Sequence, residues 1–328
     1  MFSTLLEGLS NLIMSNEDTA VKGGEYKPKP GEIVALRNLL ARETLLPIDV
    51  IGLIFDFAEY WAHSSNEIDF PKEIQGPLII SGSSARENQL VLRSFPVGFS
   101  GFREKKSLAE VLAYDRTEVR PLELAKENEP EFFKEKASYA MPKLVHPVRR
   151  IVFTIKSRDQ GWGGAGQHHG TYNTSWTWFD VGLERFDASQ TCDPTCSLDL
   201  RYESPNSTPP DLPLCALRPI RPRLEPRDGG ELAFHHPLSD DEDGMAIQHN
   251  VLASRQFKEH IVTWDWQDKP DPNVDTLSEE LGRGPNTMDG SFVRGLKLGD
   301  VITVWGKARF PGWANHVERV QIDIFWAV

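Results

Sequence analysis

Strict alternation of side chains near the carboxyl end restricts the fold of this chain more than any other feature. Two runs there, Val301–Phe310 and Val317–Val328, place apolar residues at every second position. A period of two puts successive side chains on opposite faces of a β-strand. The runs therefore predict two strands, the second with a polar outer face near its start, and a carboxyl end held within a sheet.

A second β-rich stretch covers Val148–Phe186. Its β-branched and aromatic runs, Ile151–Ile155 and Ser175–Val181, predict two strands of one antiparallel sheet. The connecting loop, Ser157–Asn173, is long and rich in Gly, His and Trp. Loops on a rigid scaffold commonly carry function, so we expect a binding surface here.

The other patterns predict a mainly-β chain, an antiparallel β-sandwich preceded by helices. Helices are expected at Met1–Ser15, Glu32–Leu40, Leu46–Trp61 and Ser107–Tyr114, paired strands at Leu78–Ile80 and Leu90–Phe95, and a strand at Gln256–Trp266. We divide the chain into an N-terminal helical segment, 1–76, and a sandwich domain, 77–328. Frequent Pro and blocks of charge predict a low-order, irregular insertion at 187–250.

Charge and composition argue against several classes of partner. The 328-residue chain carries a formal net charge of −12, which on average repels a nucleic acid backbone. A negative mean hydropathy and the lack of a run of about 18 apolar residues predict no membrane span. Three cysteines without a secretory signal favour the cytosol, with the nucleus as the alternative.

Motifs for catalysis are weak. The loop Gly161–Gly166 matches G-x-G-x-x-G, but a strand is predicted after it, where a dinucleotide site needs a helix. Asp159 and Asp180 could form the carboxylate pair of a glycoside hydrolase, as could many pairs in an acidic chain. We therefore expect no catalytic residue and no cofactor, and keep a carbohydrate-active hydrolase as an alternative.

All three cysteines, Cys192, Cys196 and Cys215, fall in the predicted insertion together with His235. These residue types could make a Cys₃His zinc site. Their spacing is loose and no second cysteine pair exists. Reduced thiols without a metal are therefore the main prediction, and a zinc site is the alternative.

Two segments resemble known families. Leu298-Gly299-Asp300 before a strand, followed by Arg309, Gly312-Trp313 and Asn315, is similar to the end of galactose-binding-like jelly rolls. The stretches 149–163 and 170–180 look like those of a large group of uncharacterised fungal proteins, whose members often combine an F-box-like or ankyrin-bearing N-terminus with this β-domain. The resemblance implies a jelly-roll sandwich and an adaptor-like role, without an established ligand.

The segment Leu46–Trp61 resembles the opening helix of an F-box, the motif that docks substrate receptors onto cullin-type ubiquitin ligases. The similarity stops where a full F-box continues into two more helices. It implies docking of a ubiquitin-ligase linker protein through Leu46, Pro47, Ile51 and Ile54. A helix that only packs on the domain is the alternative.

Several loop residues combine stacking faces with hydrogen-bonding groups. They are Arg158, Gln160, Trp162, His169, Arg309, Trp313 and Asn315. This mixture suits the edge of a sugar or a peptide. The same residues could instead tie the loop 157–173 to the turn around 311–315. The sequence thus predicts a non-enzymatic binding protein that recognises a glycan, peptide or protein surface, with an F-box-like substrate adaptor as the first alternative.

Overall fold

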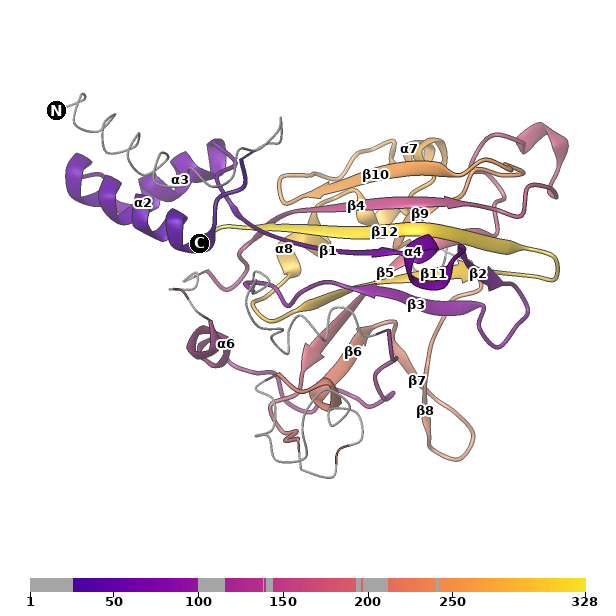
Figure 1. Ribbon diagram of the computed structural model, residues 1–328, viewed down its shortest axis with the longest axis horizontal. Helices are drawn as coiled ribbons and strands as arrows, with labels where there is room; N and C mark the ends of the chain where they lie inside the picture. The colour runs from indigo at the N-terminus through magenta and orange to yellow at the C-terminus, as the bar shows by residue number, and fades with distance from the viewer. Residues whose placement is uncertain are drawn as a thin grey trace.

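The computed structural model describes residues 26–99, 116–137, 139, 144–192, 196, 212–239, 242 and 244–328 of the chain. The helices predicted at 1–15 and 107–114 lie outside these residues. Within them, two five-stranded antiparallel sheets stack on each other (Figure 1). The prediction of a mainly-β antiparallel sandwich with N-terminal helices is confirmed.

One layer, sheet A, has β12 near its centre. Its strands, in spatial order, are β1 (Ala62–Asp69), β12 (Ala314–Trp326), β4 (Val148–Arg158) and β10 (Lys258–Asp265), and β2 (Leu78–Ser81) also pairs with β12. Asp69 lies opposite Arg319, and Leu78 lies opposite Val317, so β1 and β2 follow each other along one edge of β12. The short helix α4 (Phe70–Ile74) separates them.

The other layer, sheet B, is built in a similar way. Its strands are β3 (Asn88–Arg93), β11 (Val301–Ala308), β5 (Thr177–Phe186) and β6 (Leu217–Arg221), and β9 (Ala246–His249) also pairs with β5. β6 and β9 pair with different parts of β5. β7 (Leu224–Pro226) and β8 (Leu232–Phe234) form a separate hairpin on the sheet B side (Figure 1).

The core fills the space between the sheets. Phe153 lies opposite Ile322 in sheet A, Val181 lies opposite Val304 in sheet B, and all four are at most 1 % exposed. The ring of Phe153 makes an edge contact with that of Trp264, with centroids 4.9 Å apart. Each such large side chain contributes about 2 kcal/mol by leaving water, so this face holds the two layers together.

Sheet B is also covered on its outer face, and every residue of β11 is therefore buried. Polar side chains on that face are paired. Arg93 Nε lies 2.6 Å from Glu184 Oε2, and Lys307 Nζ lies 2.7 Å from Asp180 Oδ2. Strand β8 packs on the same face through an aromatic contact with β11. Part of the region predicted as irregular thus forms a cover for this sheet.

Two predicted strand pairings are wrong. The apolar runs within 148–186 form β4 in sheet A and β5 in sheet B, and the runs at 78–80 and 90–95 form β2 in sheet A and β3 in sheet B. In both cases the connection crosses from one layer to the other. Two apolar strands bury their inner faces equally well as neighbours or across a core, so the local pattern does not distinguish these arrangements.

Two predicted boundaries also change. β1 lies within the predicted helical segment, 1–76, yet every residue of it pairs with β12, so the sandwich begins at Ala62. The predicted low-order insertion, 187–250, contains β6 to β9, and β6 and β9 both pair with β5. These strands lack a clear apolar alternation and are fixed by main-chain pairing with partners far away in the sequence.

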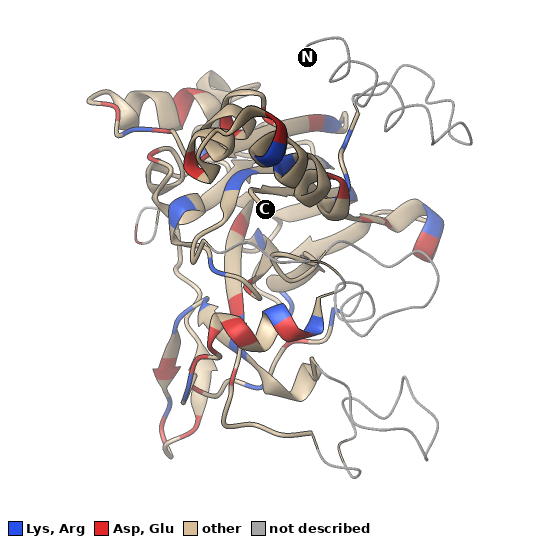
Figure 2. Ribbon diagram, turned by 90° about the vertical axis from the view of Figure 1, so that its left-hand side faces the viewer, with Lys and Arg blue, Asp and Glu red and all other residues tan. Residues whose placement is uncertain are grey.

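The helices lie around the sandwich. At the left-hand end of the molecule in Figure 1 lie α2 (Pro30–Thr44) and α3 (Ile48–Phe57), which confirm the helices predicted at 32–40 and 46–61. The shorter ones are α6 (Pro130–Lys136), α7 (Val274–Leu281), α8 (Ser291–Gly295), η1 (Gly166–His168), η3 (Leu214–Ala216) and η5 (Pro285–Thr287). In the described part of the chain, none of them has the length and apolar character that a bilayer crossing requires. Figure 2 shows acidic and basic residues interspersed over these elements.

Candidate functional site

The β4–β5 loop and the β11–β12 turn contact each other at the end of the sandwich away from α2 and α3 (Figure 1). Gln160 accepts a hydrogen bond from the main chain of β12 at 3.2 Å. Gly312, whose φ is +88°, lies against Trp162, because a Cβ added to this glycine would be 3.0 Å from the Trp162 indole. A Cβ added to Gly163 would be 4.0 Å from the indole of Trp313. Trp162 nevertheless remains 60 % exposed. These contacts support the alternative role, in which the residues tie the two loops together.

Arg158 and His169 of the predicted set also contact neighbouring protein groups. The guanidinium of Arg158 lies 5.1 Å from the ring centroid of Phe257 and donates a hydrogen bond to the following carbonyl oxygen at 2.9 Å. Nε2 of His169 lies 3.0 Å from the carbonyl oxygen of Gly163. Both side chains therefore help to fix the loop.

Arg309 is predicted as a ligand contact, but the structure buries it to 3 % exposure. Its guanidinium donates to the carbonyl oxygens of Pro237 (2.8 Å) and Ala308 (3.1 Å) and lies 5.1 Å from the ring centroid of Trp178. Burial lowers the pKa of Arg309, and the nearby Glu87 charge opposes this effect. The side chain is committed to the interior and does not face a ligand.

Asn315 is likewise buried, with 0 % exposure. Its Oδ1 accepts a hydrogen bond from Asn250 Nδ2 (2.9 Å), and its Nδ2 donates to the carbonyl oxygens of Trp178 (3.1 Å) and Lys307 (3.3 Å). Since Asn315 belongs to sheet A and its two carbonyl partners belong to sheet B, this amide connects the layers. Burial again removes a predicted ligand contact from the surface.

A cavity of about 580 Å³ lies beside these loops, between the segment that leads into β5 and helix α7. Its aromatic wall is formed by Tyr172, Trp176, Trp178 and His249. A volume of this size is typical of sites for small ligands. No residue of the predicted ligand set lines the cavity, so the candidate site does not include Trp162 or Trp313.

The aromatic wall is held by contacts within the sandwich. Trp178 is buried, stacks on His249 with ring centroids 5.6 Å apart, and donates from Nε1 to Asp180 at 2.7 Å. Trp176 is half-buried, and its ring makes an edge contact with Phe310 at 4.7 Å. Trp178 thus forms a fixed floor, and Trp176 is the more accessible aromatic surface.

Tyr172 is fixed from two sides. Its hydroxyl accepts a hydrogen bond from Lys258 Nζ at 2.8 Å. The same hydroxyl forms a second hydrogen bond with Nε2 of His260 at 3.1 Å. Its ring packs against Gly282, where the φ of +67° and the close approach both require a residue without a Cβ. Burial and the charge of Lys258 lower the pKa of His260 to about 4, so this imidazole is neutral near pH 7.

The opposite wall is polar and carries both signs of charge. Asp275 and Glu279 are exposed and one turn apart on α7, so both reach the cavity from the same face of that helix. Arg283 follows α7, and its Nε is buried without a hydrogen-bond acceptor among the described residues. Burial lowers the pKa of Arg283, and the charge of Asp268 opposes this effect. Another guanidinium nitrogen of Arg283 donates to the carbonyl oxygen of Thr287 at 3.4 Å, and a ligand with an anionic group would add a partner of opposite charge.

Sequence reasoning missed this cavity for two reasons. Tyr172, Trp176 and Trp178 lie in or next to the predicted strand 175–181, where aromatic residues are expected to be core, and His249 lies in the predicted low-order insertion. The polar wall comes from α7, in a stretch rich in Pro, Asp and Gly that carried no clear helical signal. The glycine after α7, Gly282, is a helix-ending signal that could have indicated the helix.

The two carboxylates considered for hydrolysis are both engaged by the protein. Asp159 is fully buried, and it accepts main-chain hydrogen bonds from Gly161 (2.8 Å) and Ala253. Burial raises the pKa of Asp159, and these two donors oppose the rise. Asp180 accepts from Trp178 and pairs with Lys307. Neither carboxylate lines the cavity beside α7.

Helix α3 and the residues just before it expose large apolar side chains. The set, called here the α3 patch, comprises Leu45, Leu46, Ile48, Val50, Leu53, Ile54 and Phe57, which are 36–87 % exposed. Of the predicted partner-binding residues, Leu46, Pro47 and Ile54 are exposed, and Ile51 is buried. The buried face of α3 is anchored to the sandwich by Asp56, which accepts from Arg149 Nε at 2.9 Å.

Comparisons of this chain with models of protein families, with curated proteins and with solved structures gave no match.

Proposed function

We propose that the chain is a non-enzymatic binding protein and that the cavity between the β5 approach and α7 is its recognition site. The observation that carries the proposal is Arg283, which lines a cavity of about 580 Å³ and whose buried Nε has no acceptor among the described residues. Burying a charged group with incomplete hydrogen bonding is costly, so an anionic group bound beside this guanidinium stabilises the complex.

The lining of the cavity supports a glycan or peptide that carries a carboxylate. Trp176 and Tyr172 offer aromatic surface to a sugar ring or an apolar side chain. Arg283 provides the partner for a carboxylate, and Asp275 and Glu279 can accept from hydroxyl or amino groups of the same ligand. We infer a cytosolic or nuclear location, as the sequence predicts.

An array of neutral glycans, acidic glycans and peptides tests this proposal. The full chain should retain a carboxylate-bearing member, and Trp176→Ala or Arg283→Gln should abolish this retention. Trp162→Ala is the matched control, because Trp162 is an exposed tryptophan on the same loop and does not line the cavity.

Retention lost in Trp162→Ala but kept in Arg283→Gln would contradict the cavity and favour the rim between the two loops. Glycosidase and esterase screens of the same preparation address the hydrolase alternative. Turnover that disappears in Glu279→Gln would contradict a purely binding role.

A second candidate function, the F-box-like adaptor, is favoured by the α3 patch. Leu53, Ile54 and Phe57 lie on the exposed side of α3 and are 56 %, 44 % and 87 % exposed. Single exposed apolar residues are common, but seven of them within residues 45–57 suit a surface that docks on a partner. The partner implied by the resemblance is the linker protein of a cullin-type ubiquitin ligase.

A pull-down of the full chain with that linker protein tests the adaptor. Leu53→Glu with Phe57→Glu should remove the association, because two carboxylates would have to be buried at the interface. Ile261→Glu is the control, since Ile261 is 67 % exposed but lies on β10. Absence of association with the unaltered chain would contradict this second function and leave the cavity proposal unaffected.

A further inference from the structure

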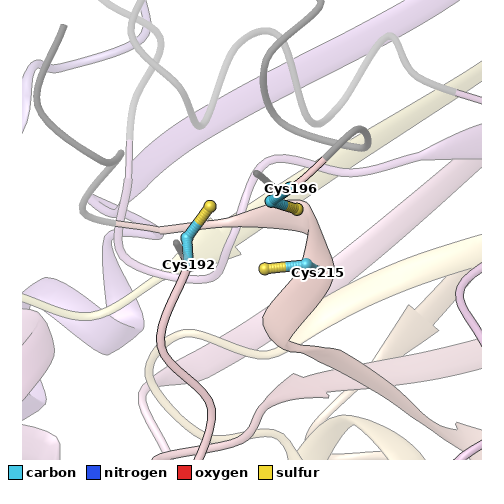
Figure 3. Close-up of side chains that lie close together, drawn as sticks. All are labelled: Cys192, Cys196 and Cys215. Atoms are coloured by element: carbon cyan, nitrogen blue, oxygen red, sulfur yellow. The ribbon is translucent and has the colours of Figure 1, made fainter. Parts of the chain in front are cut away.

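All three cysteines of the chain converge at one place. Cys192 and Cys196 follow β5, and Cys215 belongs to η3, which leads directly into β6. Their sulfur atoms all lie within 4.8 Å of one another, and each side chain is half-buried. Figure 3 shows the three side chains, which come from two separate segments, lying close together.

A buried cation fixes the two segments beside this cluster. Arg218 is 4 % exposed, and its guanidinium donates to the carbonyl oxygen of Cys215 (2.8 Å) and to Oε1 of Gln190 (3.1 Å). The main-chain N–H of Asp187 also donates to the carbonyl oxygen of Ala216 at 2.8 Å. The chain before Cys192 and the chain around Cys215 are therefore held together by contacts other than the thiols.

The geometry fits one ion better than disulfide formation. Zinc bound tetrahedrally at about 2.3 Å from sulfur places its thiolates about 3.8 Å apart, so shifts of about 1 Å or less would bring the three sulfurs into position. None of the three is in a disulfide. A disulfide would use two of these thiols and leave the third, whereas one ion can bind all three.

We propose that Cys192, Cys196 and Cys215 bind one thiophilic metal ion, Zn²⁺ being the first choice, as three thiolate ligands. His235, the fourth ligand considered from the sequence, does not belong to this cluster, and its Nδ1 lies 2.9 Å from Glu225. The bound ion fastens the segment that leaves β5 to the start of β6, so its role is structural. The site is separate from the cavity of the proposed function and does not depend on it.

Cobalt binding by the full chain tests the site. The reduced, metal-free protein should bind one Co²⁺ with the intense charge-transfer absorption of thiolate ligands, and Zn²⁺ should displace it. The intensity of the absorption reports the number of thiolates in the unaltered chain, so this readout needs no variant. Each of Cys192→Ser, Cys196→Ser and Cys215→Ser should lose the absorption or reduce it, and His235→Ala should keep it unchanged.

Several outcomes would overturn the proposal. Cobalt binding without the thiolate absorption, or an absorption that survives all three serine substitutions, would exclude this ligand set. Loss of the absorption in His235→Ala would show that the ligand set differs from three thiolates alone. A reduced chain that binds neither Co²⁺ nor Zn²⁺ would exclude the site.

Discussion

Replacing Asn315 by Ala tests whether the buried amide between the sheets is structural. The change removes one hydrogen bond from Asn250 and two to main-chain carbonyl oxygens, all from a side chain with 0 % exposure. Each bond contributes about 1 kcal/mol, and the buried partners left behind cost about as much or more. We expect the free energy of unfolding to fall by about 3–5 kcal/mol.

Urea unfolding, followed by tryptophan fluorescence and by circular dichroism, measures this loss. Asn273→Ala is the control, because Asn273 is exposed at the start of α7 and makes no capping hydrogen bond through its side chain, so its effect should be within about 0.5 kcal/mol. Asn250→Ala, alone and combined with Asn315→Ala, should give a coupling energy of about 1 kcal/mol between the two amides. A loss below about 1 kcal/mol in Asn315→Ala would refute the structural role.

Three other outcomes follow from buried groups described above. Glu184→Gln should lower the free energy of unfolding by about 2–4 kcal/mol in urea unfolding, because it leaves Arg93 buried without its carboxylate, and a loss under about 1 kcal/mol would contradict this. The pKa of His260 is about 4 in the folded chain, and its ordinary value is 6.5. Between these values the unfolded chain binds a proton at His260 and the folded chain does not, so the free energy of unfolding should fall as the pH drops from 6.5 toward 4. His260→Gln should flatten that slope, and an unchanged slope in unfolding measured across this window would show that His260 is not its source. Gly282→Ala should displace Tyr172 and cost at least about 1 kcal/mol by thermal unfolding, whereas unaltered stability would contradict the close contact.

The strands with regular alternation could be predicted from sequence, and their partners could not. β10, β11 and β12 carry clear periodic patterns, and their bounds agree well with the predicted runs. β4 and β5 were also predicted, but their placement in opposite sheets depends on pairing with strands far away in the chain. β1 was missed because its sequence, A-H-S-S-N-E-I-D, is polar, and it is fixed by pairing along its whole length with β12.

The candidate site was harder to predict than the fold. Arg309 and Asn315 have the polar groups of ligand contacts, and the sequence does not show that the protein itself uses those groups. The loops that carry Trp162 and Trp313 contact each other, but neither tryptophan lines the cavity against α7. The proximity of Cys215 to Cys192 and Cys196 requires the return of the chain to sheet B, which their spacing does not reveal.

The position of β12 between β1 and β4 has a consequence for synthesis of the protein. β1 leaves the ribosome early, but all of its pairing partners lie between Arg319 and Trp326. Until that part of the chain has been translated, β1 and one edge of β4 stay without their native neighbour, and exposed strand edges are prone to aggregation. Chains released before residue 319 would therefore be incomplete in the middle of a layer, and they should be substrates for chaperones and proteases.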